Sequence, residues 1–156
     1  MANLIFIGSV FLVFVTIYML LFTKNAAKSY ADYILSFLLL VHCWSVILFL
    51  ILFSKYILYF PHVFKTGLPF NFLIAPLSYL YVRAVLYNET KFKIRDFIHL
   101  IPFVIVLLNY IPFYLLPVNE KLTIIHNSLS YWPNTFKYQA GVLPEFFLII
   151  FRLILT

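Results

Sequence analysis

The chain has 156 residues, of which 65% are hydrophobic and only 10% are charged, and its mean hydropathy is +1.03. A soluble domain is about half apolar and a quarter charged, so this composition excludes an ordinary water-soluble globular protein. The formal charge of +6 comes from cations scattered between apolar runs, which favours anionic lipid headgroups over nucleic acid as partners.

The apolar runs predict an all-α fold: a polytopic bundle of about five hydrophobic transmembrane helices in one integral membrane domain, residues 1–156. The first run, residues 4–22, has no cation before it and no small-residue cleavage site after it. A secretory signal peptide has both a cation before its apolar run and a cleavage site of small residues after it. We therefore expect this run to stay on the protein as a helix.

The second run, residues 33–53, contains the single cysteine, Cys43, next to His42. Adjacent side chains on a helix point about 100° apart, which suits interior packing better than chelation of one metal ion. One cysteine alone cannot form an intramolecular disulfide. We expect no metal site and no cofactor.

Prolines mark the third and fourth runs, residues 68–87 and 97–116. Membrane helices tolerate proline because neighbouring groups satisfy the freed carbonyls, so the sequence predicts kinks within continuous helices. Each run also carries one amide, Asn71 or Asn109. Such amides more often bridge helices than bind a ligand, and both remain candidate ligand-binding residues.

Residues 117–143 form the longest polar stretch. Loops of this length are usually functional or disordered, and the apolar residues within this one predict an ordered external cap at the membrane surface. The aromatic pair Tyr131 and Trp132 makes it a candidate ligand-binding segment. The commoner explanation for such aromatics is an interfacial belt.

The last run, residues 144–156, rises only about 20 Å as a helix, which is less than the thickness of a bilayer core. The chain therefore looks truncated within a fifth helix. Glu145 and Arg152 lie two turns apart along one face of this run. Ionisable groups at membrane depth are functional hypotheses, although Glu145 is close to a helix end.

Cations are concentrated in the connections after the first and third runs, which hold six against four in the alternate loops. Short loops rich in Lys and Arg remain cytoplasmic, so we predict an inner-membrane protein with an external amino terminus. The densest group contributes anchoring residues at the cytoplasmic interface: Arg83, Lys91, Lys93 and Arg95. Arg83 is interpreted mainly as a snorkelling anchor, with a counter-charge for Asp96 or an anionic ligand as the alternative.

Asp96 and His99 complete the predicted cytoplasmic interface. Their spacing of three residues lets them meet on one helix face, which predicts an interfacial hydrogen bond acting as a structural latch. A proton-sensing role for the same pair is the alternative. We assign no catalytic residue and expect no enzymatic activity.

A family resemblance rests on the segment APLSYLYVRAV (residues 75–85) followed by KIRDFIHLIPF (residues 93–103). Together with the preceding YFPHVFKTGLPFNFLI, it resembles the membrane half of AraC-type helix-turn-helix regulators, found mainly in Bacteroidetes. The resemblance covers about residues 24–116. It implies a block of hydrophobic helices before a cytoplasmic DNA-binding domain, which is absent from this chain. The partners it implies are a second copy of the chain, an unidentified external ligand, and DNA only through the missing domain.

The leading hypothesis is a sensor or anchor module of a membrane-tethered regulator. An external ligand would favour one of two helix packings, and the cytoplasmic helix ends would transmit that choice. One alternative is an integral membrane enzyme of lipid metabolism that uses Arg83, Asp96 and His99. Another is a transporter half whose cavity wall comes from the third and fourth runs.

Overall fold

The computed structural model describes residues 2–23, 29–130 and 141–155. Within these ranges all regular elements are helical, which confirms the predicted all-α fold. The α-helices are α1 (Ala2–Tyr18), α2 (Tyr30–Phe53), α3 (Gly67–Asn71), α4 (Ile74–Leu86), α5 (Ile101–Asn109), α6 (Ile111–Leu115), α7 (Val118–Ser130) and α9 (Glu145–Leu155). Shorter turns of π- and 3-10-helix occupy Met19–Thr23, Tyr56–Leu58, Pro61–Val63 and Ile94–Leu100.

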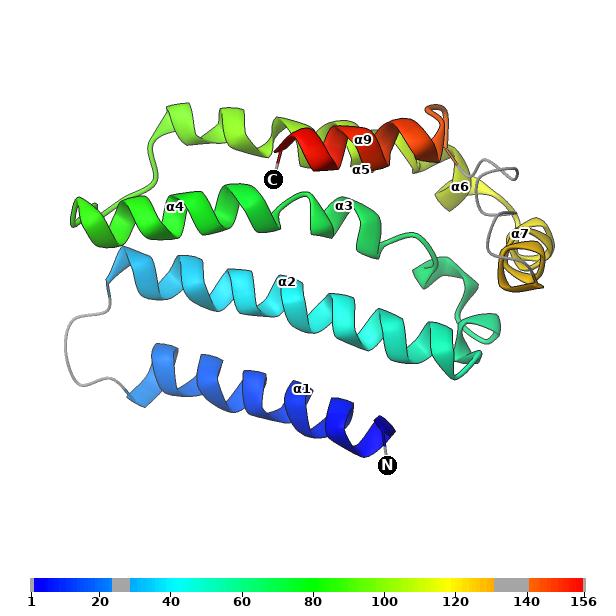
Figure 1. Ribbon diagram of the computed structural model, residues 1–156, viewed down its shortest axis with the longest axis horizontal. Coiled ribbons are helices and arrows are strands. Elements are labelled where there is room, and N and C mark those ends of the chain that lie inside the picture. Colours follow the sequence, from blue (N-terminus) through cyan, green and yellow to red (C-terminus); the bar gives the residue numbers. More distant parts are fainter. Residues whose placement is uncertain (1, 24–28, 131–140, 156) are drawn as a thin grey trace.

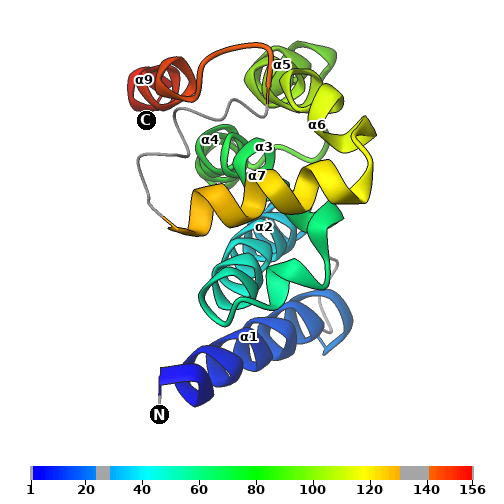
Figure 2. The ribbon, with the colours of Figure 1, turned by 90° about the vertical axis from the view of Figure 1, so that its right-hand side faces the viewer.

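The long helices lie in layers and alternate in direction (Figure 1). α1 covers α2, α2 packs against α3 and α4, and α5 packs on α3. Figure 2 shows α9 and α5 apart from each other at the same side of the layers. α7 crosses one end of these layers (Figure 2). We call this the α7 end. The opposite end, where α2 begins and α4 ends, carries residues 87–96 and is called the basic end.

α2 is a continuous helix of 24 residues that begins at a capping box. The Ser29 hydroxyl accepts a hydrogen bond from the Asp32 backbone N–H at 3.3 Å, and the Asp32 carboxylate accepts one from the Ser29 N–H at 3.0 Å. These reciprocal bonds satisfy backbone donors that a helix start leaves unpaired. The inner face of α2 forms a core with α4, and this core contains Ile34, Val41, Leu77, Leu80 and Ala84.

Prolines divide the third and fourth runs into shorter helices. Pro69 and Pro76 lie in the first turns of α3 and α4, and Pro102 and Pro112 lie in the first turns of α5 and α6. The first turn tolerates proline because its N–H groups have no partner within the helix. The expectation of kinks within continuous helices was therefore wrong, because these prolines begin new helices.

The described residues contain one helix that is long and apolar enough to cross a bilayer, α2. A second candidate exists if Pro61–Asn71 and Ile74–Leu86, which meet at an angle of 43°, count as one broken span. α1 is apolar, but its 17 residues are fewer than the roughly 20 that a helix needs to cross a bilayer core. The described part of the chain thus offers fewer unbroken spans than the five that the sequence predicts, because the prolines interrupt two of the runs.

The predicted external cap, residues 117–143, contains the helix α7. Its Lys121 is fully buried, and the Nζ atom lies 2.9 Å from Nδ1 of His62 and 2.8 Å from the Tyr114 carbonyl oxygen. Ile125 of the same helix joins a core at the α7 end. α7 is therefore packed against the turn before α3 and the end of α6.

Asn109, at the end of α5, fastens the segment that leads into α9. Its backbone carbonyl accepts from the Val142 N–H at 3.3 Å, and its side-chain Oδ1 accepts from the Leu143 N–H at 2.6 Å. A Cβ atom on Gly141 would lie 2.8 Å from Asn109 Cγ and 2.9 Å from its carbonyl oxygen. This close approach requires a residue without a side chain.

We predict that Gly141→Ala destabilises the protein by about 1–3 kcal/mol, the cost of overpacking. The added methyl group would push Asn109 away from Val142 and Leu143. Gly8→Ala is the matched control, because a Cβ atom there meets nothing within 4 Å. Thermal melting in detergent should show a lower Tm for Gly141→Ala alone. Equal Tm values for both variants would contradict this packing.

Candidate functional site

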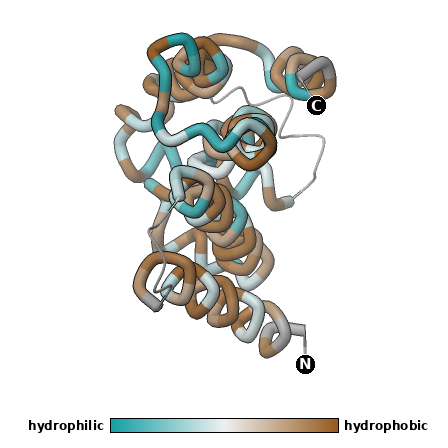
Figure 3. The backbone as a smooth tube through the Cα atoms, turned by 90° about the vertical axis from the view of Figure 1, so that its left-hand side faces the viewer, coloured by the Kyte–Doolittle hydropathy of each residue, from teal (hydrophilic) through white to brown (hydrophobic). Residues whose placement is uncertain are grey.

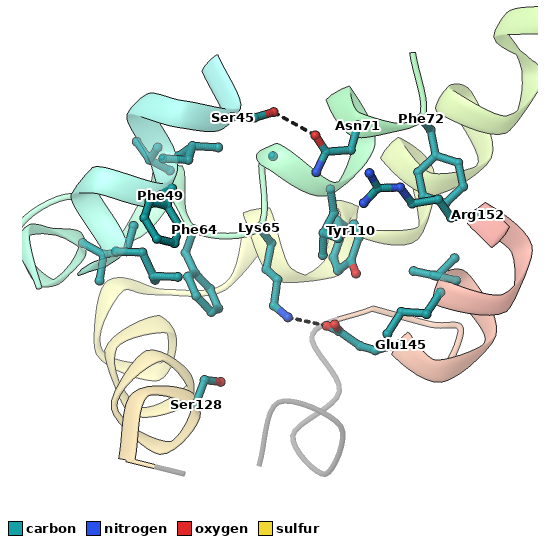
Figure 4. A pocket seen from close by; sticks show the side chains of 18 of the residues that line it. Ser45, Phe49, Phe64, Lys65, Asn71, Phe72, Tyr110, Ser128, Glu145 and Arg152 are labelled. Atoms are coloured by element: carbon teal, nitrogen blue, oxygen red, sulfur yellow. Dashed lines mark hydrogen bonds and ion pairs between the residues drawn. The ribbon is translucent and has the colours of Figure 1, made fainter. Parts of the chain in front are cut away.

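A partly open cavity of about 810 Å³ lies between α2, α3, α7 and α9. Figure 4 shows side chains from these helices converging on it. Most of its walls are apolar, and we call it the α2–α9 cavity. Its apolar lining includes Leu48, Phe49, Leu52, Phe53, Ile57, Leu68, Phe72, Leu148, Ile149 and Leu153. The volume lies within the range of about 300–1,000 Å³ typical of small-molecule pockets.

A buried ion pair lines this cavity. The Lys65 Nζ atom lies 2.5 Å from the Glu145 Oε1 atom, and the two side chains are 6% and 7% exposed. Lys65 has a left-handed backbone, with φ of 67°, immediately before α3. Such a conformation is unfavourable for a residue with a side chain and often marks a functional position. The pair joins segments that are 80 residues apart.

Further polar groups lie along the cavity wall. The Ser45 hydroxyl of α2 donates to Asn71 Oδ1 of α3 at 2.8 Å. The Ser128 hydroxyl is buried and has no hydrogen-bond partner among the described residues. Figure 4 shows it directed into the cavity, on the same side as Lys65. Arg152 of α9 also lines the cavity. Its side chain extends from α9 toward Asn71 and Tyr110 (Figure 4).

The two candidate amides have bridging contacts. Asn71 joins α3 to α2 through Ser45, and it also lines the cavity. Asn109 holds the segment before α9, and its side-chain nitrogen has no partner among the described residues. The structure thus gives both amides the bridging contacts that the sequence favoured, and only Asn71 among them lines the α2–α9 cavity.

A charge cluster at the basic end contains Arg83, Glu89, Lys93 and Asp96. Arg83 Nε lies 2.9 Å from Glu89 Oε2, and Arg83 Nη2 lies 2.7 Å from Asp96 Oδ1. Lys93 pairs with the other oxygen of Glu89. The Lys93 backbone N–H donates to Asp96 Oδ2 at 2.9 Å. Arg83 therefore binds two carboxylates, Glu89 from the loop after α4 and Asp96 from the 3-10 helix Ile94–Leu100.

The end of α4 brings Glu89 back to Arg83. Asn88 has a left-handed backbone, with φ of 50°, and the Glu89 N–H donates to the Ala84 carbonyl at 3.1 Å. This is the bond of a Schellman motif, which reverses the chain after a helix. Asn favours this conformation more than most residues. Local backbone chemistry thus positions one carboxylate of the charge cluster.

The neighbouring charges lower the pKa of both carboxyls. For Glu89 the main cause is the hydrogen bond from Lys93, reinforced by Arg83. Burial alone would raise the pKa of Asp96, but the Lys93 backbone N–H and Arg83 outweigh it, and the pKa lies below its ordinary value. Both groups therefore stay ionised as partners of Arg83.

Two interpretations of these residues were wrong. Arg83 does not extend freely as a snorkelling anchor; it takes up the alternative arrangement, with Asp96 as its counter-charge. Asp96 does not form a latch with His99, because both its carboxylate oxygens bond elsewhere. The His99 ring instead packs against Tyr79, with the ring centroids 4.9 Å apart.

The remaining predicted residues lie apart from both sites. Lys91 and Arg95 are exposed at the basic end. Cys43 is buried in α2 whereas His42 is exposed, so the expectation that His42 packs in the interior was wrong. The candidate ligand-binding residues Tyr131 and Trp132 lie outside the described residues.

Sequence reasoning missed Lys65 and Ser128 as cavity residues. It placed Glu145 and Arg152 along one face of the last run without naming a partner for either, and the structure pairs Glu145 with Lys65. Spacing within one helix cannot reveal a partner 80 residues away. The available signal was the placement of Lys65 beside Gly67, in a turn between two apolar runs.

Comparisons with protein-family models, with curated proteins and with solved structures find no match to this chain. The resemblance to AraC-type regulators therefore stays a prediction from the sequence. The α2–α9 cavity and the charge cluster are the features of the described residues that bear on function.

The lowered carboxyl pKa values predict a loss of stability in acid. Carboxyls with a lower pKa in the folded protein stabilise it above their ordinary pKa of about 4, and this contribution disappears as the pH falls through the lower folded values. Asp96→Asn should reduce Tm at neutral pH and flatten the dependence of Tm on pH below about 4. Arg95→Gln, at an exposed position, is the control and should retain the wild-type profile. A profile for Asp96→Asn identical to that of the wild type would contradict the ion-pair arrangement.

Proposed function

We propose that this chain is a multi-pass membrane module that senses a ligand in the α2–α9 cavity and transmits its presence to the basic end. This function corresponds to the input half of an AraC-type membrane-tethered regulator, the family that the sequence resembles. On that resemblance, the output would be a cytoplasmic helix-turn-helix domain, which alone would contact DNA, and the module would pair with a second copy of itself.

The solvent exposure of apolar side chains supports the membrane location. α1 presents large apolar groups around its circumference, among them Leu4 at 73% and Phe11 at 65% exposed. A helix that is apolar on all sides is buried in a large core or in a membrane. Figure 3 shows hydrophobic residues along α1 and α2, whereas hydrophilic residues gather in the connections. A bilayer would cover these surfaces.

The direct succession of α3 and α4 across a short break is the observation that carries the sensing proposal. α3 contributes Gly67, Leu68 and Asn71 to the cavity wall, and α4 carries Arg83 of the charge cluster. The segment Pro61–Asn71, which includes α3, meets α4 at 43°. A ligand that changed this angle would move Arg83 relative to Asp96. Coupling of this kind needs an element with two arrangements, and a broken helix pair is a suitable one.

A role in catalysis has less support at the basic end. A lipid enzyme using Arg83, Asp96 and His99 would need these groups to face a substrate. Arg83 is shared between two carboxylates, Asp96 is only 2% exposed at its side chain, and His99 packs against Tyr79. These contacts fit a structural and signal-transmitting cluster better than an acid–base site.

One specific observation supports the transporter alternative. The wall of the α2–α9 cavity includes α3 from the third run and Tyr110 from the fourth, as a transporter half would require. Transport would also need the cavity to open alternately to both sides. The apolar walls suit retention of a lipophilic ligand better than passage of a polar one, so sensing remains the preferred function.

The topology can be tested by thiol labelling of intact cells. On a Cys43→Ala background, a cysteine replacing Ser130 at the α7 end should react with an impermeant maleimide. A cysteine replacing Thr90 at the basic end should not, because that end is predicted to be cytoplasmic. Both should react after lysis, since both positions are exposed. Labelling of Thr90→Cys alone in intact cells would reverse the orientation.

Sensing can be tested by filling the cavity without a ligand. Ile149 and Ile150 are neighbours on α9 with similar exposure, 43% and 40%, but only Ile149 lines the cavity. Ile149→Trp should therefore change amide hydrogen exchange at residues 87–96, measured by mass spectrometry, by several-fold. Ile150→Trp should leave it unchanged.

Two results would contradict the sensing proposal. One is unchanged exchange at residues 87–96 in Ile149→Trp although exchange around the cavity itself is altered. The other is the same change in both tryptophan variants, which would indicate a general disturbance of α9. The first result would uncouple the cavity from the basic end, and the second would show that the basic end responds to α9 in general and not to the cavity.

A further inference from the structure

The α2–α9 cavity combines apolar walls with one buried ammonium group. Its apolar residues come from α2 on one side and from α9 on the other. Lys65 and Glu145 lie where the turn before α3 faces the beginning of α9. A ligand that fills this space is therefore largely apolar and carries a polar group at the Lys65 end.

Lys65 has hydrogen-bonding capacity beyond its ion pair. An ammonium group carries three N–H donors, and among the described residues the hydrogen-bond acceptor for Lys65 is Glu145 Oε1. The Ser128 hydroxyl adds a second buried donor without a partner among those residues. Both groups can donate to an oxygen anion, so an anionic ligand group fits them better than a cationic one.

The buried ion pair shows that a carboxylate fits at Lys65. Isolated buried ion pairs add little to stability, because desolvation of the two charges offsets their attraction. Here the partner of Lys65 is a carboxylate, held at 2.5 Å in a cavity large enough for another molecule. Glu145 therefore occupies a position that a ligand carboxylate could take with the same charge and geometry.

We infer that the α2–α9 cavity binds a single-chain carboxylate of the fatty-acid class, whose carboxylate displaces Glu145 from Lys65. This inference rests on the proposed sensing function and names its ligand. The acyl chain lies between α2 and α9, and Glu145 is an internal competitor for the ligand. Displacement frees the first turn of α9 from the turn before α3, which is the conformational change that the sensing proposal needs.

Glu145 and Lys65 should have opposite effects on binding. The probe is radiolabelled palmitate, bound to the chain in nanodiscs of neutral phosphatidylcholine at pH 8. Lys65→Met should weaken binding about tenfold or more, the effect of losing a charge-assisted hydrogen bond. Glu145→Gln should strengthen binding several-fold, because it removes the charge that competes with the ligand. Ile149→Trp should block binding, and Ile150→Trp should not.

Further variants and probes keep the test decisive. Lys65→Gly also removes the ammonium group but relieves the left-handed backbone, so it reports on the charge if Lys65→Met folds poorly. Hexadecanol and hexadecyl phosphate test the headgroup at a constant chain length. We expect palmitate to bind more tightly than either. The Tm of each variant confirms that it is folded.

Three results would overturn the ligand assignment. One is weaker palmitate binding in Glu145→Gln, which would make Glu145 part of the binding site and not a competitor. The second is unchanged binding in both Lys65 variants. The third is binding of hexadecanol or hexadecyl phosphate at least as tight as that of palmitate.

The ligand assignment and the sensing function fail separately. If palmitate binds as expected but leaves hydrogen exchange at residues 87–96 unchanged, the ligand assignment stands and the sensing function is wrong. If Ile149→Trp changes that exchange but palmitate does not bind, the sensing function stands with a different ligand.

Discussion

The positions of the prolines constrain the path of the chain after α2. A proline lacks a backbone N–H, and its ring collides with the preceding turn, so it kinks or breaks a helix unless it lies in the first turn. Pro69 and Pro76 therefore start α3 and α4 separately, and Pro102 and Pro112 start α5 and α6. The break between α3 and α4 lets one part of an apolar run line the cavity while the other packs on α2.

Ion pairs hold the two ends of the molecule in different ways. At the basic end, Arg83 binds carboxylates that follow it closely in the chain, and the left-handed Asn88 makes that arrangement local. At the α2–α9 cavity, Lys65 and Glu145 come from distant segments and depend on the packing of α9. The local cluster is suited to rigidity, whereas the long-range pair can open when α9 moves.

The apolar surface connects composition with the proposed function. α1 packs against α2 and leaves most of its large side chains exposed, so its own contacts cover little of its surface. A bilayer would solvate these groups, and it would also supply lipophilic molecules to a partly open cavity between α2 and α9. Membrane location and an acyl-chain ligand are therefore mutually consistent.

The sequence by itself determined the helical fold, the positions of the apolar runs and the concentration of charge after the third run. These features follow from local composition and spacing. The proline positions were also visible, but their effect was misjudged, because a proline in the first turn of a new helix and one at a kink have the same local pattern. For residues 117–143 the sequence likewise predicted an ordered cap, but it did not indicate that this segment contains the helix α7.

Only the tertiary structure decided which charges meet. Arg83 could have reached the headgroups or Asp96, and the loop that returns Glu89 and Asp96 to it selected the second arrangement. Lys65 and Glu145 have no sequence relationship that predicts their contact. A buried charge takes the nearest partner that the packing provides, and that partner is set by how helices distant in sequence lie against each other. For this reason the sequence supplied Asn71 and Glu145 as candidates but missed Lys65 and Ser128, and the fold alone assembled the cavity.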